Sequence, residues 1–213
     1  PFSLEEAETL LIKDLTNNED FKKSLRIKGL DKRMEDRGLI LRFLAFYERT
    51  YIKCQSGPKK FLNEFLETYQ NANESKINEY RDKFKHCMKA CITVFGEHAF
   101  RLKNDPTTSS RVKSAGEWAS RPNAAIFQVI ATSFAKYDLS QITRAADAIY
   151  EEYLDLVNSD TQWVDQVRRA TGVQSRLKYS FETWNNRLEN VLENYDSNDK
   201  KRAFSKNLKE EMF

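Results

Sequence analysis

The stretch GLILRFLAFY (residues 38–47) is apolar on nearly every side of a helix, and Arg42 is its one charged residue. A helix that is apolar all round is usually enclosed by other helices. The stretch is too short to cross a membrane, which takes about 20 apolar residues. We therefore expect a long helix, from about residue 35 to 53, at the centre of a helical bundle.

Helical signals continue on both sides of this stretch. Ser3 and Glu6 have the spacing of a capping box, and Asn18 can cap a short helix. The clearest periodicity lies in residues 173–195, where apolar side chains recur at steps of three and four. No segment shows a convincing two-residue alternation. The sequence therefore predicts an all-α fold, a multi-helix bundle or array of about eight to nine helices.

The expected helices form a single domain over residues 1–213. Besides those named above, they cover about residues 58–69, 75–95, 122–137, 140–157, 160–170 and 199–213. Residues 103–121 are polar and rich in turn-forming residues, so we expect a long loop there. Gly96 is expected to end the helix that precedes this loop.

Composition fits a chain with a buried core. Of the 213 residues, 40% are hydrophobic and 31% are charged, which is too apolar for disorder. The net charge of +3 decides little about partners. Three cysteines, an odd number, do not make a disulfide framework and indicate a reducing compartment, so a cytoplasmic location is expected and no membrane partner.

Candidate chemistry is sparse. Cys87 and Cys91 share a helix face, but His86 points about 100° away, and a closed zinc site needs four ligands. Burial of both thiols as small apolar residues is the favoured interpretation. The seven acids in residues 138–165 are better explained as a solvated helix face than as a metal site. We predict no catalytic residue, no metal site and no cofactor in this chain.

Basic residues gather in two stretches that could contact nucleic-acid phosphates. The first contains Lys22, Lys23, Arg26, Lys28, Lys32 and Arg33; the second contains Arg168, Arg169, Arg176 and Lys178. Ordinary surface charge explains them equally simply and is the favoured interpretation.

Arg42 differs from these residues because apolar neighbours surround it. A buried guanidinium must be paired, or it costs several kcal/mol. We expect Arg42 either to form a structural ion pair with an acid on a neighbouring helix or to extend its charged end to solvent. Neither role is catalytic.

Five stretches resemble the helical region of GmrSD-type restriction nucleases. They are KRMEDRGLILRFLAFYERTY (32–51), GPKKFLNEFLETY (57–69), VFGEHAFRL (94–102), RPNAAIFQVIATSFAK (121–136) and TGVQSRLKYSFETWNNRL (171–188). The Arg42–Phe43 step recurs in such a family helix, whereas Gly38 stands where relatives commonly have an acid. The matching patterns are packing patterns rather than catalytic signatures.

The resemblance implies a longer parent protein. Family members combine a ParB/sulfiredoxin-like N-terminal domain, which uses a nucleotide, with a metal-dependent HNH nuclease domain, and the motifs of both are missing here. We expect this chain to be the middle part of such an antiphage nuclease, although a naturally short protein is the alternative. The predicted role is a non-catalytic linker or scaffold. DNA and the flanking domains are the implied partners.

Two other functions stay open at this stage. One is a helical module that binds nucleic acid through the basic residues. The other is a protein-interaction or oligomerisation bundle, which would make the chain a homo-oligomer.

Overall fold

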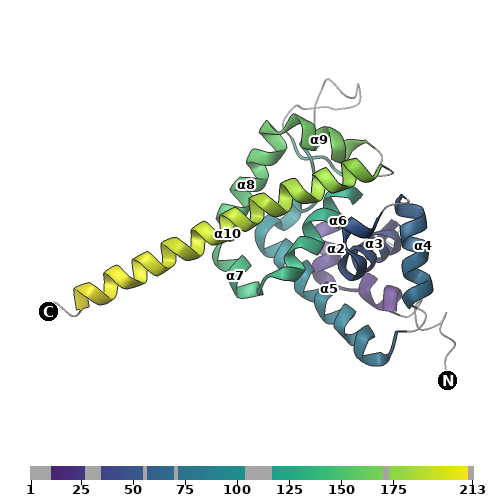
Figure 1. Cartoon of the computed structure of the whole chain (residues 1–213), viewed down its shortest axis with the longest axis horizontal. Helices are drawn as coiled ribbons and strands as arrows, with labels where there is room; N and C mark the ends of the chain where they lie inside the picture. The colour runs from purple at the N-terminus through teal and green to yellow at the C-terminus, as the bar shows by residue number, and fades with distance from the viewer. Residues whose placement is uncertain are drawn as a thin grey trace.

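The computed structural model describes residues 11–26, 35–54, 57–69, 72–103, 117–169 and 173–210, with side chains described as far as residue 195 (Figure 1). Its α-helices are α2 (Glu19–Leu25), α3 (Glu35–Arg49), α4 (Pro58–Tyr69), α5 (Glu74–Phe95), α6 (Ala124–Ser133), α7 (Leu139–Arg144), α8 (Ala146–Ser159), α9 (Thr161–Arg168) and α10 (Gln174–Glu210). Short 3-10 helices follow α3, α5 and α6, namely η1 (Tyr51–Lys53), η2 (Gly96–His98) and η3 (Phe134–Lys136). Within the described ranges the fold is all-α, as predicted.

Side-chain caps fix where several helices begin and end. The side chain of Asn18 accepts a hydrogen bond from the Phe21 amide at 2.8 Å, which confirms the predicted cap of α2. Asn73 caps α5 in the same way, one residue before its first helical residue. Gly96 ends α5 with a positive φ of 53°, a conformation that glycine adopts without strain. The predicted end of this helix is therefore confirmed.

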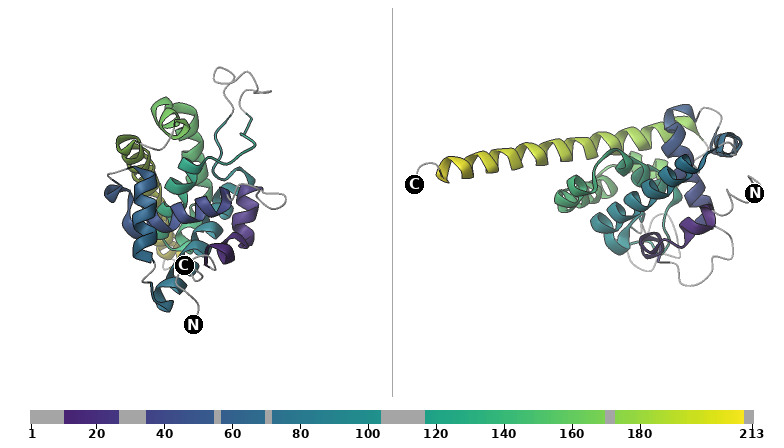
Figure 2. Two further views of the ribbon diagram at one scale, coloured as in Figure 1. Left: turned by 90° about the vertical axis from the view of Figure 1, so that its right-hand side faces the viewer. Right: turned by 90° about the horizontal axis from the view of Figure 1, so that it is seen from below.

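The most enclosed helix is α6. Every residue from 125 to 133 is buried, and α3, α5, α9 and α10 all pack on it. The helix predicted to be central, α3, lies against α6 and is exposed at Gly38 and Glu48. It also ends at Arg49, four residues before the expected boundary, and η1 follows. Figure 2 shows the helices gathered around this centre.

An aromatic cluster fills the core between α2, α3, α5 and α6. The ring of Phe84 lies 5.3 Å from that of Phe21 and 5.2 Å from that of Phe43, both edge to face. Phe127 of α6 adds edge contacts with Phe21 at 5.9 Å and Phe100 at 4.8 Å. Such pairs add about 0.5–1.5 kcal/mol each beyond the area that they bury. The cluster joins segments that are distant in sequence.

The last helix, α10, packs on the body and then extends past it (Figures 1 and 2). The predicted steps of three and four recur on its buried side at Leu177, Phe181, Trp184 and Leu188, and Leu192 continues them. Val173, the first residue of the predicted pattern, is 48% exposed. The boundary expected near residues 195–199 is absent, because the helix is continuous to Glu210. No Gly or Pro in that stretch interrupts the backbone hydrogen bonds.

Two further expectations differ in detail. The single helix predicted over residues 140–157 is divided into α7 and α8 at Ala145. Of the predicted loop, residues 104–116 lie outside the described residues. Its described ends meet in an isolated bridge between Lys103 and Trp118, and the Ala119 amide donates to the Leu102 carbonyl at 2.8 Å. No helix in the described part of the chain is both long and apolar enough to span a membrane.

Candidate functional site

The first group of predicted basic residues is only partly described. Lys28, Lys32 and Arg33 lie outside the described residues. The other three, Lys22, Lys23 and Arg26, line an open groove of about 920 Å³ between α2 and the end of α5. Acids share this groove: Lys22 lies 3.3 Å from Glu19, and Arg26 forms an ion pair with Glu97. These acids weaken the attraction of the groove for a phosphate.

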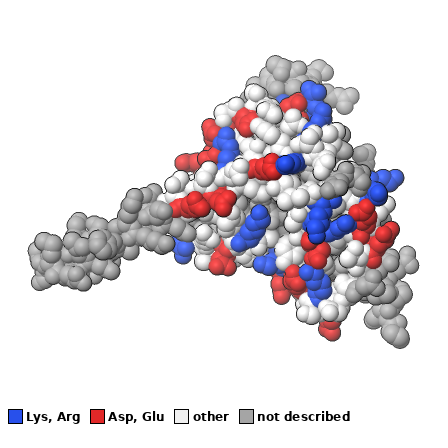
Figure 3. Space-filling model, in the orientation of Figure 1, with Lys and Arg blue, Asp and Glu red and all other residues white. Residues whose placement is uncertain are grey.

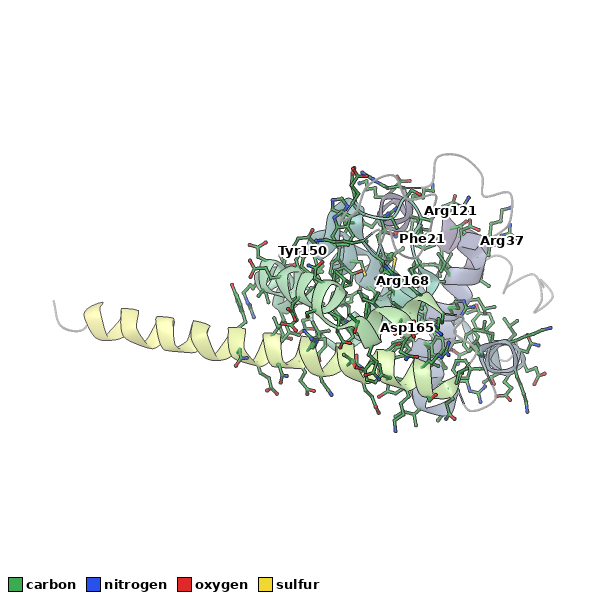
Figure 4. The ribbon with its side chains drawn as sticks, turned by 90° about the horizontal axis from the view of Figure 1, so that it is seen from above. Phe21, Arg37, Arg121, Tyr150, Asp165 and Arg168 are labelled. Carbon is green, nitrogen blue, oxygen red and sulfur yellow. The ribbon has the colours of Figure 1, made fainter. Side chains whose placement is uncertain are left out.

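The second group lies at the junction of α9 and α10. Arg169 pairs with Asp165 at 2.6 Å, and Lys178 lies 3.7 Å from Glu182. Arg168 donates to the Lys103 carbonyl at 3.3 Å, while Arg176 is half-buried in the first turn of α10. Figure 4 shows Arg168 and Asp165 on α9.

The two groups do not form one basic face. Residues 99–103 lie between them, because Arg101 binds the end of α2 and Lys103 accepts the hydrogen bond from Arg168. Acidic and basic side chains alternate over the surface seen in Figure 3. This mixed pattern gives no continuous track for a nucleic-acid backbone on that face.

Among the described residues, Arg42 binds an amide rather than the acid that we expected. Its Nη1 donates to the side-chain oxygen of Gln128 at 3.1 Å, and within the described residues no ion pair includes it. Burial lowers the pKa of Arg42, and the nearby Cys54 opposes that effect. The helix that faces Arg42, α6, carries no acid, so the ion pair is not seen among the described residues and stays a prediction. Gln128 is fully buried, and within the described residues its Nε2 has no partner.

Another arginine, Arg101, is buried more deeply than the half-buried Arg42 and was missed. It is fully buried and donates to the carbonyls of Ser24 at 2.8 Å, Leu25 at 3.0 Å and Ala99 at 2.8 Å. Ser24 and Leu25 form the last turn of α2, where carbonyls lack helical partners and the helix dipole is negative. Arg101 therefore caps α2 through tertiary contact. Its position inside the apolar stretch at residues 99–102 was the available signal.

The cysteines are structural. Cys54, Cys87 and Cys91 are free and buried, and burial raises the pKa of each thiol. Their burial confirms the packing interpretation of Cys87 and Cys91. His86 lies 2.9 Å from the Tyr137 carbonyl instead of joining the thiols. Among the described residues, no three His, Cys, Asp or Glu side chains come together as a metal site would need.

Four of the seven acids of residues 138–165 have structural partners, namely Glu152, Asp155, Asp160 and Asp165. Glu152 and Asp155 both accept hydrogen bonds from Arg187 of α10, at 2.5 Å and 2.8 Å. Asp160 caps α9 through the Trp163 amide at 2.8 Å. These contacts attach α10 to α8 and fix the start of α9.

A cavity of about 230 Å³ lies where α3, η1, α6, η3 and α10 meet. Its walls include the rings of Phe46, Tyr51 and Phe181, its polar side includes Ser133 and Asn185, and Lys136 stands on its lining. No local pattern predicted this cavity, because its residues come from three distant stretches of the chain.

Comparisons with known proteins add no relative. No protein-family model, no curated protein and no solved structure matches this chain. The resemblance to GmrSD-type nucleases therefore stays a prediction from the sequence.

Proposed function

We propose that this chain is a non-catalytic helical scaffold of a GmrSD-like antiphage nuclease in the cytoplasm. The observation that supports it best is the form of α10, which is part of the core at one end and leaves the body at the other (Figure 2). At about 1.5 Å per residue, its 37 residues give a length of roughly 55 Å. A helix of that length can hold an attached domain at a set distance.

The attachment of α10 to the body is firm. Trp184 is fully buried and lies edge to face with Tyr153 of α8 at 6.0 Å. One turn later, Arg187 binds two acids of α8. An aromatic anchor and a double ion pair restrict both sliding and rotation of the helix. A movement of α8 would therefore be passed to the far end of α10.

The roles of the polar residues support a scaffold rather than a catalyst. The buried Arg101 caps a helix, the acids of α8 hold α10, and the described thiols are fully covered. In this proposal the nucleotide, the divalent metal and most of the DNA contact belong to other parts of the parent nuclease. Three free cysteines fit a reducing compartment.

The stiffness of α10 can be measured by spin labelling. Cysteines introduced at the exposed Gln162 of α9 and at Asn207 of α10 would carry the labels, and the buried native thiols would stay unreacted. We expect one narrow distance distribution in pulsed dipolar spectroscopy. A Gly-Gly-Ser insertion between Asp196 and Ser197 is the control and should broaden it. Equal breadth in both proteins would contradict the scaffold.

Catalysis and the two rival functions need separate assays. The purified chain, given Mg²⁺, ATP or GTP and plasmid DNA, should leave the DNA intact; cleavage that copurifies with the chain would end the non-catalytic proposal.

Charge reversal at Lys22, Lys23, Arg168 and Arg169 should not change DNA retention on a filter. A loss of salt-dependent retention would favour the nucleic-acid-binding module instead. Sedimentation as a stable dimer would favour the oligomerisation bundle.

A further inference from the structure

The cavity between α3 and α10 has aromatic walls. The rings of Tyr51 and Phe181 are stacked, with centroids 4.7 Å apart and an angle of 12° between their planes. Phe46 lies 5.5 Å from Phe181 on the same wall. Aromatic walls favour planar aromatic ligands, which offer faces and edges of complementary charge. For scale, an engineered apolar cavity of about 150 Å³ binds benzene, so a volume of about 230 Å³ admits a somewhat larger ring system.

A polar pair stands at one side of the cavity. Ser133 Oγ lies 2.7 Å from Asn185 Oδ1 and 2.6 Å from the Val129 carbonyl. A hydroxyl has one proton, so it donates to only one of these oxygens at a time. If Ser133 donates to Val129, the Asn185 amide turns over, donates to Ser133 and directs its oxygen elsewhere. The pair can therefore offer a ligand either a donor or an acceptor.

The charge of the lining is positive. Among the described residues that line the cavity, Lys136 is the only charged one. Two acids contact or lie beside lining residues without lining the cavity: Glu79 accepts a hydrogen bond from the Tyr47 hydroxyl at 2.8 Å, and Glu182 lies 3.7 Å from Lys178. A ligand that reaches Lys136 is therefore favoured if it carries a negative charge.

The backbone holds one wall of the cavity in place. Thr50 has φ 57° and ψ 158°, a conformation that β-branched residues rarely adopt and that costs about 1–3 kcal/mol. Its amide still donates to the Phe46 carbonyl at 3.1 Å, which closes α3. The chain then reverses, so that Tyr51 lines the cavity while Ile52, also on the lining, is 65% exposed.

We propose that this cavity is a binding site for a small planar aromatic carboxylate. The ring would lie against Tyr51, Phe181 and Phe46, the polar edge would meet Ser133 and Asn185, and the carboxylate would lie near Lys136. This inference does not depend on the scaffold function, because α10 lines the cavity only through Phe181 and Asn185, in the part of the helix that packs on the body.

Two probes test the site by nuclear magnetic resonance, with amide shifts followed in ¹⁵N-labelled protein. Both indole and indole-3-carboxylate should shift the amides of the lining residues. The carboxylate should bind about two- to fivefold more tightly, the range of an exposed ion pair. Lys136→Gln should remove that preference. The matched control, Lys85→Gln at an exposed position of α5, should keep it.

Two further variants keep the test decisive. Ala135→Phe fills the cavity and should abolish the shifts caused by both probes. Because a larger residue there could prevent folding, Ile52→Glu at the exposed rim is the second variant and should weaken only the carboxylate. The proposal is overturned if neither probe shifts the lining amides at millimolar concentration. It is equally overturned if the two probes bind alike in the wild type, or if the preference survives Lys136→Gln.

Discussion

The two sides of α6 differ although both are buried. On one side Phe127 contacts Phe21 and Phe100, and the space is filled by aromatic rings. Around the rest of the helix Gln128 binds Arg42 and Ser133 binds Asn185, and a cavity remains beside Ser133. We call these the closed side and the open side of α6.

This difference shows how one helix can hold a fold together and leave room for a ligand. The closed side supplies stability, since tight packing of large rings is costly to disturb. The open side carries neutral polar groups that bind one another only in part. Gln128 Nε2 has no partner among the described residues. A ligand can bind more easily on such a side, because the polar groups there can exchange one hydrogen-bond partner for another.

Removing a ring from the closed side should have the largest effect. Phe127→Ala leaves a cavity against Phe21 and Phe100, and we expect a loss of about 3–5 kcal/mol in the free energy of unfolding. Urea denaturation followed by circular dichroism measures it. A loss below about 1 kcal/mol would mean that the closed side is not tightly packed.

The next test compares the buried Arg101 with the half-buried Arg42. Arg101 binds three carbonyls beside the closed side, so Arg101→Met leaves the end of α2 unsatisfied and should cost about 2–3 kcal/mol. Arg42 makes one hydrogen bond of 3.1 Å to Gln128 on the open side, and Arg42→Met should cost about 1 kcal/mol. The same denaturation assay applies. Equal losses would remove the distinction between the two sides.

The fold was largely predictable from local signals. Apolar steps of three and four identified the buried side of α10, and Asn18, Pro58 and Gly96 marked helix boundaries. The break at Ala145 was not predictable, because no breaker residue stands there. Periodicity identifies a helix well, but tertiary packing decides whether it continues.

The candidate site was much less predictable. A sequence shows that Arg42 needs a partner, but not that α6 would offer Gln128 instead of an acid. Nor does it show that Tyr51, Ser133 and Phe181 meet, since they lie on three separate segments. A cavity is a property of how helices are placed, and local patterns do not contain that information.

A smaller effect is expected for the polar pair of the open side. Ser133→Ala removes one partner of Asn185 and should cost about 1 kcal/mol. The double variant Ser133→Ala with Asn185→Leu should cost less than the sum of the two single changes, because no polar group is then left unpaired. Denaturation of the four proteins gives the coupling. Strict additivity would show that the pair contributes nothing to the fold.

The smallest effect should come from protonating His98, which adds a positive charge beside the closed side. Burial lowers the pKa of His98, and the neighbouring cations Arg26 and Arg101 lower it further. Because the folded pKa lies below the unfolded value of about 6.5, the unfolded state binds more protons between the two. The contribution of His98 is therefore complete above about pH 6.5 and is lost as the pH falls through the folded pKa.

His98→Gln should flatten that part of the stability profile while leaving the value at pH 8 nearly unchanged. Trp118 stacks on the His98 ring at 5.1 Å, and glutamine keeps a planar amide for that contact. Unfolding in urea at pH 5.5, 6.5 and 8 measures the slope. Glu97 precedes His98 in the sequence and binds Arg26. The control is therefore Glu97→Gln, made alone and together with His98→Gln. In the single variant Glu97→Gln, Arg26 and Arg101 act on His98 without an opposing carboxylate. The free energy of unfolding should then change more steeply with pH than in the wild type. A slope that is the same in all these proteins would mean that protonation of His98 does not oppose folding.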